Sequence, residues 1–152
     1  MRLTRAGEYG VRCVAFLAIQ AARGVSTPSV RSKIARQMEI PEAFLAKIIP
    51  QLHKAGIVTI TRGSRGGLQL ACPADQVTLL DVVEAVSGRI ALNDCVLRPG
   101  SCHKTPTCPV HCVWVTASNQ LRDTLSQANF ASIAGCMPPQ SPTDDAQHKE
   151  QS

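Results

Sequence analysis

The sequence has few aromatic residues, only 3%, with one Trp, one Tyr and three Phe among 152 residues. Because 44% of the residues are hydrophobic, its core must be built mainly from aliphatic side chains. No apolar run approaches the roughly 20 residues of a membrane-spanning helix. The run from Cys13 to Ile19 is short, and Glu8 lies where a signal peptide would be basic. We therefore expect a cytoplasmic protein with no membrane partner.

The chain also lacks a Cys-x-x-Cys pair and a glycine-rich nucleotide-binding fingerprint. We therefore expect no enzymatic activity and no small-molecule substrate, although a redox enzyme or cluster carrier is one alternative. The seven cysteines are odd in number and unevenly spaced, which argues against a secreted disulfide scaffold. In a reducing cytoplasm, clustered thiols more often bind metal or sense redox state.

Acidic residues are scarce in the first half of the chain. Residues 1–72 contain eleven Lys and Arg against three Glu, a balance of +8, whereas residues 73–152 contain five against eight Asp and Glu, a balance of −3. This asymmetry is typical of a polyanion-binding module joined to a second functional part, although uneven surface charge alone is common.

Helical patterns dominate the first 55 residues. Thr4 can cap a helix that ends near Ala22, and the run Ser26-Thr27-Pro28 is a strong start for a second helix that reaches about Met38. A third helix follows over about 41–55. Two short helices joined by a tight turn form a helix-turn-helix.

A short hairpin follows these helices. The segments 57–60 and 68–71 are typical of strands, and the intervening TRGSRGG carries Arg62, Ser64 and Arg65 on a glycine-rich turn. A basic hairpin directly after a helix-turn-helix is a wing. The predicted fold class is therefore mainly α with a small β-hairpin, namely a winged helix-turn-helix followed by a long C-terminal dimerisation helix.

The chain divides into four predicted parts. The winged domain covers residues 1–88 and ends with a helix capped by Thr78 and Asp81. A cysteine-rich loop covers 89–112, a dimerisation helix covers 109–134, and a disordered tail rich in Pro, Gln and charge covers 135–152. Within the long helix, Trp114, Ser118, Leu121 and Leu125 repeat at coiled-coil spacing and predict a dimer seam.

The helix-turn-helix predicts which residues contact DNA. The second helix of such a motif lies in the major groove, the start of the first can bind a phosphate, and wing arginines suit the minor groove. The candidates are Ser26, Thr27, Ser29, Arg31, Glu42, Ala43, Lys47, Gln51, Arg62, Ser64 and Arg65. Pro50 should kink the recognition helix, since it lacks the N–H that would bond to Ala46.

The stretch CVLRPGSCHKTPTCPVHC, residues 95–112, holds four cysteines and two histidines on a segment broken by proline and glycine. Such a loop predicts a metal site, either zinc or an iron–sulfur cluster. The wide spacing favours a cluster weakly, because structural zinc sites generally use tighter cysteine pairs.

The order of these parts resembles the bacterial winged-helix iron–sulfur regulators of the IscR and NsrR type, the Rrf2 family. The resemblance covers residues 1 to about 134. It rests on the segments MRLTRAGEYGVR, FLAKIIPQLHKAGIV, TRGSRGGLQL, VTLLDVVEAVSG and CPVHCVW. The resemblance implies a homodimer that binds palindromic double-stranded DNA, most simply as a repressor, with an affinity controlled by a cluster that senses redox state, nitric oxide or iron–sulfur status.

The resemblance also implies the ligands. Cys95, Cys102 and Cys108 match the three thiolates, and His111 matches the histidine that completes a [2Fe–2S] site in IscR-like members. NsrR-like members instead use an aspartate from the partner's first helix around a [4Fe–4S] cluster, and Glu8 lies near that position. Cys112 departs from both patterns and is a third candidate. We favour His111 and [2Fe–2S], and keep a zinc- or thiol-switch regulator without a cluster as the alternative.

Overall fold

The computed structural model of the chain describes residues 3–64 and 66–136. Its helices and strands are α1 (Arg5–Ala22), α2 (Arg31–Gln37), α3 (Glu42–Lys54), β1 (Val58–Thr61), β2 (Gly67–Leu70), α4 (Leu79–Ser87), α5 (Asp94–Leu97), α6 (His111–Gln127) and α7 (Phe130–Gly135). Two short 3-10 turns, η1 (Ala74–Gln76) and η2 (Thr105–Thr107), lie between them. None of the helices in these two ranges is long and apolar enough to cross a membrane.

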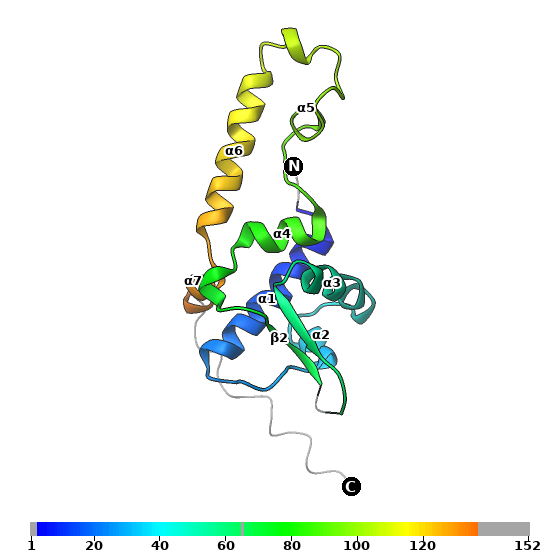
Figure 1. The fold of residues 1–152 in the computed structure, drawn as a ribbon, viewed down its shortest axis with the longest axis vertical. Coiled ribbons are helices and arrows are strands. Elements are labelled where there is room, and N and C mark those ends of the chain that lie inside the picture. Colours follow the sequence, from blue (N-terminus) through cyan, green and yellow to red (C-terminus); the bar gives the residue numbers. More distant parts are fainter. Residues whose placement is uncertain (1–2, 65, 137–152) are drawn as a thin grey trace.

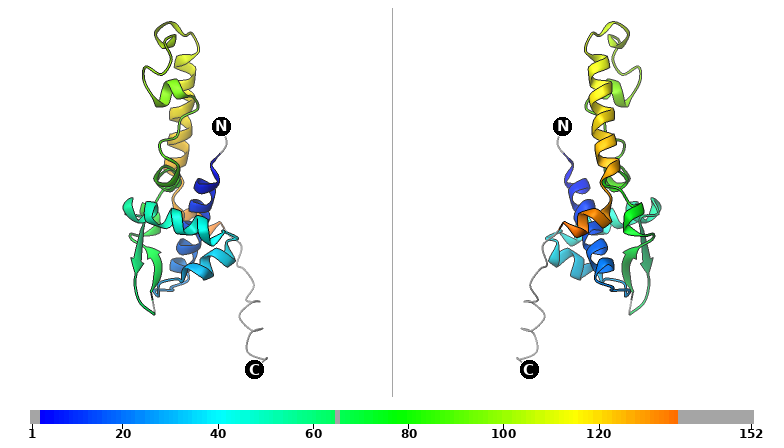
Figure 2. Two further views of the ribbon diagram at one scale, coloured as in Figure 1. Left: turned by 90° about the vertical axis from the view of Figure 1, so that its right-hand side faces the viewer. Right: turned by 90° about the vertical axis from the view of Figure 1, so that its left-hand side faces the viewer.

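The elements form a winged body with one projection. Helices α1 to α4, α7 and the hairpin pack together, whereas α6 and the segment that carries α5 extend away from this body side by side (Figures 1 and 2). The predicted fold class, a mainly helical winged helix-turn-helix, is confirmed.

Helix α1 runs through the centre of the body. Thr4 caps it by accepting a hydrogen bond from the Gly7 N–H at 3.0 Å, as its sequence predicts. Residues 13–18 are all buried and contact the inner faces of α2 and α3 in one aliphatic core. Phe130 of α7, fully buried, adds an aromatic ring to this core together with Phe16.

Helix α4 packs closely along α1. A Cβ atom added at Gly10 would lie 3.0 Å from Cγ2 of Val86, so glycine at this position permits the close approach of the two helices. The predicted capping box is present, because Thr78 accepts from the Asp81 N–H while the Asp81 carboxylate accepts from the Thr78 N–H. The orientation of α4 is therefore fixed by both its cap and its contact with α1.

The predicted start of the second helix is wrong. Helix α2 begins at Arg31, because the chain before it is held in extended conformation by β2. Ser29 donates its N–H to the Leu68 carbonyl and accepts from the Leu68 N–H, both at 2.8 Å. The hairpin itself pairs Val58 with Leu70 and Thr61 with Gly67, one residue away from the predicted strand limits.

The single helix predicted over 109–134 is divided. Helix α6 ends at Gln127, and Asn129 caps the separate α7 by accepting from the Ser132 N–H at 2.9 Å. Between them, the Ala128 carbonyl accepts from the Leu79 N–H at 2.8 Å, and Phe130 then enters the core. Burial of Phe130 thus turns the chain back onto the winged body. Of the predicted tail, Gly135 belongs to α7 and Cys136 follows as its C-cap, whereas 137–152 lie outside the described residues.

Candidate DNA-reading surface and cysteine loop

Helix α3 presents a solvent-exposed face suited to reading DNA. Its inner residues Leu45, Ile48, Ile49 and Leu52 are buried. The four α3 residues predicted to contact DNA are all exposed: Glu42, Ala43, Lys47 and Gln51. The helix continues past Pro50 to Lys54, close to the predicted end at residue 55.

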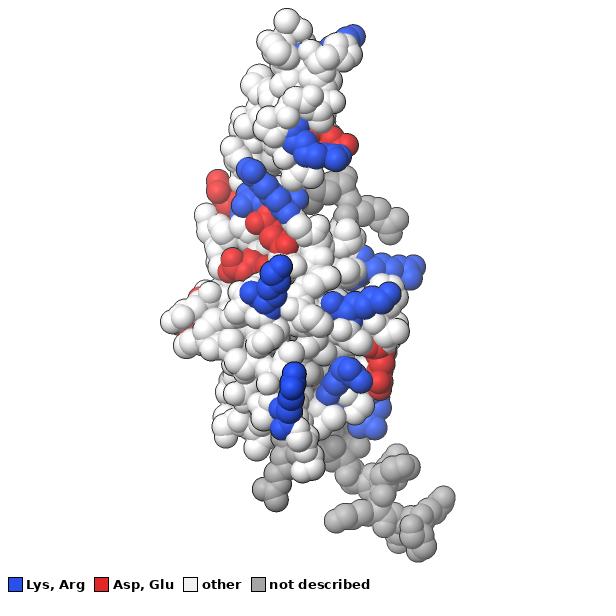
Figure 3. All heavy atoms as spheres, turned by 45° about the vertical axis from the view of Figure 1, so that its right-hand side comes forward, with Lys and Arg blue, Asp and Glu red and all other residues white. Residues whose placement is uncertain are grey.

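The other predicted DNA contacts divide into three groups. Ser26, Thr27, Arg31, Arg62 and Ser64 are exposed, whereas Arg65 lies outside the described residues. Ser29 differs from its prediction, since it is 9% exposed and its N–H bonds to the Leu68 carbonyl instead of being free for a phosphate. Figure 3 shows Lys and Arg side chains spread over the winged body with few acidic side chains among them.

The turn between α2 and α3 has two features that the sequence did not reveal. Glu39 has a φ of 52°, a left-handed conformation that normally favours glycine. Directly before Glu39, the Met38 carbonyl accepts a hydrogen bond from Arg12 of α1 at 3.3 Å. The geometry of the helix-turn-helix is therefore fixed by a contact with α1 as well as by the sequence of its own turn.

The same arginine pairs with the alternative fourth ligand. Arg12 Nη2 lies 2.6 Å from Glu8 Oε1, one helical turn away on α1. Both side chains are partly exposed, at 38% and 49%. A metal bound by Glu8 would have to compete with this ion pair.

The cysteine loop, residues 89–112, runs from the end of α4 along α6 to the tip of the projection, so that only its far part is distant from α3 (Figure 1). All its thiols are free; Cys95 and Cys108 are half-buried, and Cys102 and Cys112 are exposed. Within residues 3–64 and 66–136, no three His, Cys, Asp or Glu side chains are close enough together to hold a metal ion. The structure thus places the predicted ligands on one loop but does not bring them together.

The chemistry of the donor set nevertheless fits a metal or an iron–sulfur cluster. Three reduced thiols share the loop with His111, the first residue of α6. The His111 Nδ1 atom is buried and has no hydrogen-bond partner among the described residues. A buried imidazole nitrogen without a partner is costly, and a metal ligand bond would satisfy it.

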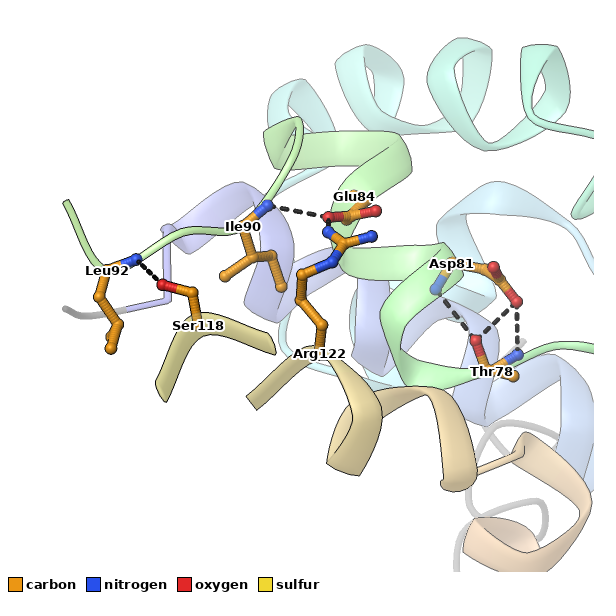
Figure 4. A network of polar contacts seen from close by, with 7 residues as sticks. All are labelled: Thr78, Asp81, Glu84, Ile90, Leu92, Ser118 and Arg122. Carbon is orange, nitrogen blue, oxygen red and sulfur yellow. Dashed lines mark hydrogen bonds and ion pairs between the residues drawn. The ribbon is translucent and has the colours of Figure 1, made fainter. Parts of the chain in front are cut away.

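The base of the loop, residues 90–93, is held by polar contacts that join α4 and α6 (Figure 4). The Ile90 N–H donates to Glu84 Oε1 at 2.9 Å, and the Leu92 N–H donates to Ser118 Oγ at 3.1 Å. Glu84 also forms an ion pair with Arg122. The sequence does not reveal this network: its helical repeat predicts Ser118 in a dimer seam, whereas Ser118 is 2% exposed within its own chain.

A helix-turn-helix with an exposed, basic reading face and a hairpin wing defines a winged-helix DNA-binding protein. The chain belongs to the Rrf2 family, described as iron-dependent transcriptional regulators, whose model matches residues 3–135. The predicted family is therefore confirmed, and the protein is a transcriptional regulator rather than an enzyme.

Individual relatives agree with this assignment. Protein rrf2 of Nitratidesulfovibrio vulgaris is 30% identical over 133 residues, which cover 88% of this chain and 87% of the relative. CymR of B. subtilis, described as a global cysteine regulator, superposes with a TM-score of 0.72 at 20% identity, covering 91% of this chain and 99% of CymR. IscR of T. potens gives a TM-score of 0.67 at 22% identity, covering 89% and 87%. At these identities, the two structures show the shared fold alone.

Proposed function

We propose that this regulator is a homodimer that binds a palindromic operator as a repressor, and that an iron–sulfur cluster in its cysteine loop controls its DNA affinity. The observation that carries the proposal is the loop itself, which holds the free thiols of Cys95, Cys102 and Cys108 and leads to His111 at the start of α6, whose Nδ1 has no partner among the described residues. The family description, iron-dependent, supports the same cofactor.

DNA recognition is assigned to α3 and the wing. Lys47 can reach a guanine or a phosphate, Gln51 can pair with adenine, and Glu42 can accept from a cytosine amino group. Arg62 contributes positive charge on the wing beside this face. Lys47→Ala should therefore weaken binding to all sequences and reduce the salt dependence by about one counterion, whereas Gln51→Ala should relax specificity at one base pair.

Cys95, Cys102 and Cys108 would hold the cluster, with His111 as the fourth ligand. The cluster, when bound, supplies a group that nitric oxide, oxidants or iron shortage can alter. Because the thiols are not brought together here, binding requires the loop to fold more tightly, so occupancy and loop conformation are linked. Histidine ligation favours [2Fe–2S] over [4Fe–4S].

The dimer is assigned to α6. Of α6, which lies wholly within the described residues, only Ser118 is buried. Val113 is 58% exposed, and Val110 just before the helix is 50% exposed. A long helix with apolar side chains left uncovered is suited to pairing with a second copy.

Anaerobic purification tests the cofactor. We expect a coloured protein with iron and acid-labile sulfide, which binds its operator with different affinities before and after cluster removal. The operator can be a duplex selected from a random library by the purified chain, titrated over a salt series. Equal affinities of the cluster-bound and cluster-free protein would contradict the proposal.

Single substitutions assign the fourth ligand. His111→Ala should abolish or change the visible spectrum of the purified protein, whereas Glu8→Gln and Cys112→Ala should leave it unchanged. Cys136→Ala, outside the loop, is the matched cysteine control. Loss of the spectrum in Glu8→Gln alone would transfer the fourth ligand to the partner subunit.

The second candidate is a zinc- or thiol-switch regulator, in which Cys112 joins the other three loop cysteines. The exposure of Cys102 and Cys112 favours it, since accessible thiols are open to oxidation. A colourless protein with one zinc per chain, or one whose DNA affinity follows thiol oxidation without iron, would support this alternative.

A further inference from the structure

Glu84 of α4 connects three parts of the molecule. Its Oε1 atom accepts from the Ile90 N–H at 2.9 Å and also faces the guanidinium of Arg122 on α6 (Figure 4). The two charged side chains are only 24% and 25% exposed, in contrast to the Asp94–Arg98 pair, at 72% and 69%. A partly buried, charge-assisted contact is less screened by solvent than a surface pair and fixes geometry more strongly.

A second contact holds the same segment from α6. The Leu92 N–H donates to Ser118 Oγ at 3.1 Å, and Ser118 is 2% exposed. With the Asn93 amide oriented to suit its neighbours, its oxygen accepts from Trp114 Nε1 at 3.1 Å and its NH₂ group donates to the Leu92 carbonyl at 2.8 Å. The base of the cysteine loop is therefore fixed along one face of α6.

Trp114, Ser118 and Arg122 share that face because they are spaced by four residues. Trp114 and Ser118 contact the base of the loop directly. Arg122 is linked to it through Glu84 of α4. Two residues of the predicted dimer seam, Trp114 and Ser118, thus contact the chain's own loop. Other faces of α6 are left to a second subunit.

The opposite side of α4 belongs to the winged body. Val82 and Val83 are buried, and Val86 lies against Gly10 of α1, the helix whose Arg12 contacts the turn before α3. Any movement of Glu84 with the loop base therefore displaces α4. Helix α4 packs against α1, which in turn contacts the helix-turn-helix. No other charged side-chain contact between α4 and α6 occurs in the described part of the chain.

From this arrangement we infer that Glu84, Arg122 and Ser118 are positioning residues that transmit the conformation of the cysteine loop to the DNA-reading domain. They set the angle between α6 and the winged body, and hence the separation of the two α3 helices in a dimer. The inference rests on the proposed function, because it takes the dimer and the palindromic operator from it.

The test compares Glu84→Gln, Glu84→Ala, Arg122→Lys and Ser118→Ala with the unaltered full chain. Asp123→Asn matches the loss of a carboxylate, and Ser126→Ala matches the loss of a hydroxyl, each at an exposed position of α6. Thermal unfolding and the visible spectrum first establish that each variant folds and loads its loop. DNA affinity is then measured with and without iron and sulfide reconstitution, on selected duplexes whose half-site spacing is varied one base pair at a time.

We expect Glu84→Ala and Ser118→Ala to load normally. The ratio of their DNA affinities with and without reconstitution should be about tenfold smaller than that of the unaltered chain. They should also accept a wider range of half-site spacings. Glu84→Gln and Arg122→Lys, which keep an acceptor or the charge, should be intermediate, and the two controls should match the unaltered chain. A purely structural role would lower the unfolding temperature without changing the affinity ratio or the spacing preference, and that result would overturn the inference.

The two proposals fail in different ways. If reconstitution does not change the DNA affinity of the unaltered chain, the sensing function fails, and the spacing series alone then tests the positioning role. A broadened spacing preference in Glu84→Ala would support that role without the cluster. A different outcome is that the unaltered chain responds to reconstitution while the variants retain both its ratio of DNA affinities, with and without reconstitution, and its spacing preference. In that case only the inference fails.

Discussion

The backbones of Ser29 and Leu68 are joined by two hydrogen bonds of 2.8 Å, one in each direction. This pairing attaches the segment before α2 to the second strand of the wing, so that the helix-turn-helix and the wing are held in one orientation. The contact is close because Gly67 precedes Leu68, and a Cβ atom at Gly67 would lie 2.5 Å from the Ser29 carbonyl oxygen.

Gly67→Ala should therefore separate the wing from the helix-turn-helix. The added methyl group collides with backbone, which cannot rotate away, so we expect the free energy of unfolding to fall by about 1–3 kcal/mol. DNA affinity should fall with it. Gly135→Ala is the control, since an added Cβ there meets no atom within 4 Å. Urea titrations of both variants measure the difference, and equal stabilities would contradict the steric argument.

Features with local causes were predictable from the sequence, and features with distant causes were not. The caps at Thr4 and Thr78 depend on residues three positions away, and both were found. The start of α2 was missed because its determinant is Leu68, in the wing. The end of α6 was missed because Phe130 is buried among residues of the winged body, which a helical repeat cannot show.

The candidate site divides in the same way. The exposed face of α3 follows from its helical period, so Lys47 and Gln51 were found. The cysteine ligands were named from residue type and family resemblance, and they stay a prediction. Glu84 and Arg122 carry no motif, and only the packing of α4 against α6 brings them together.

Cys13 gives the chain a pH-dependent stability. Burial raises the pKa of its thiol from 9.0 to about 12. Because the folded pKa is higher than the unfolded pKa, the contribution of Cys13 is complete below pH 9 and is lost as pH rises toward 12. In that window, the stability advantage of the unaltered chain over Cys13→Ala should shrink by up to about 1.4 kcal/mol per pH unit. Urea unfolding between pH 7 and pH 10.5 measures it.

The control for Cys13 is Val14→Ala, which truncates a neighbouring core residue without removing a titratable group. Its stability deficit relative to the unaltered chain should stay constant over the same pH range. A constant deficit for Cys13→Ala as well would show that the thiol titrates alike in the folded and unfolded chains.

Pro50 limits the stability of α3. It lies inside the helix on the exposed face and has no N–H for the Ala46 carbonyl. Pro50→Ala should restore this hydrogen bond and raise the free energy of unfolding by about 2 kcal/mol, somewhat less than the full helical cost of proline because the unfolded chain becomes more flexible. Pro41→Ala, just before the helix, should change stability much less. Thermal and urea unfolding compare the two, and a loss of stability in Pro50→Ala would contradict the expectation.

Glu39 stores strain in the turn of the helix-turn-helix. Its φ of 52° costs a residue with a Cβ atom about 1 kcal/mol, which glycine avoids at the expense of greater freedom in the unfolded chain. Glu39→Gly should therefore raise the free energy of unfolding by up to about 1 kcal/mol, whereas Glu39→Ala keeps the Cβ atom and should not. Both variants remove a negative charge beside the basic reading face, so both should bind non-specific duplex DNA more tightly at low salt. Urea titration separates the backbone effect from the charge effect, since only the charge effect is common to both. Equal stabilities of the glycine and alanine variants would show that the turn carries no strain at Glu39.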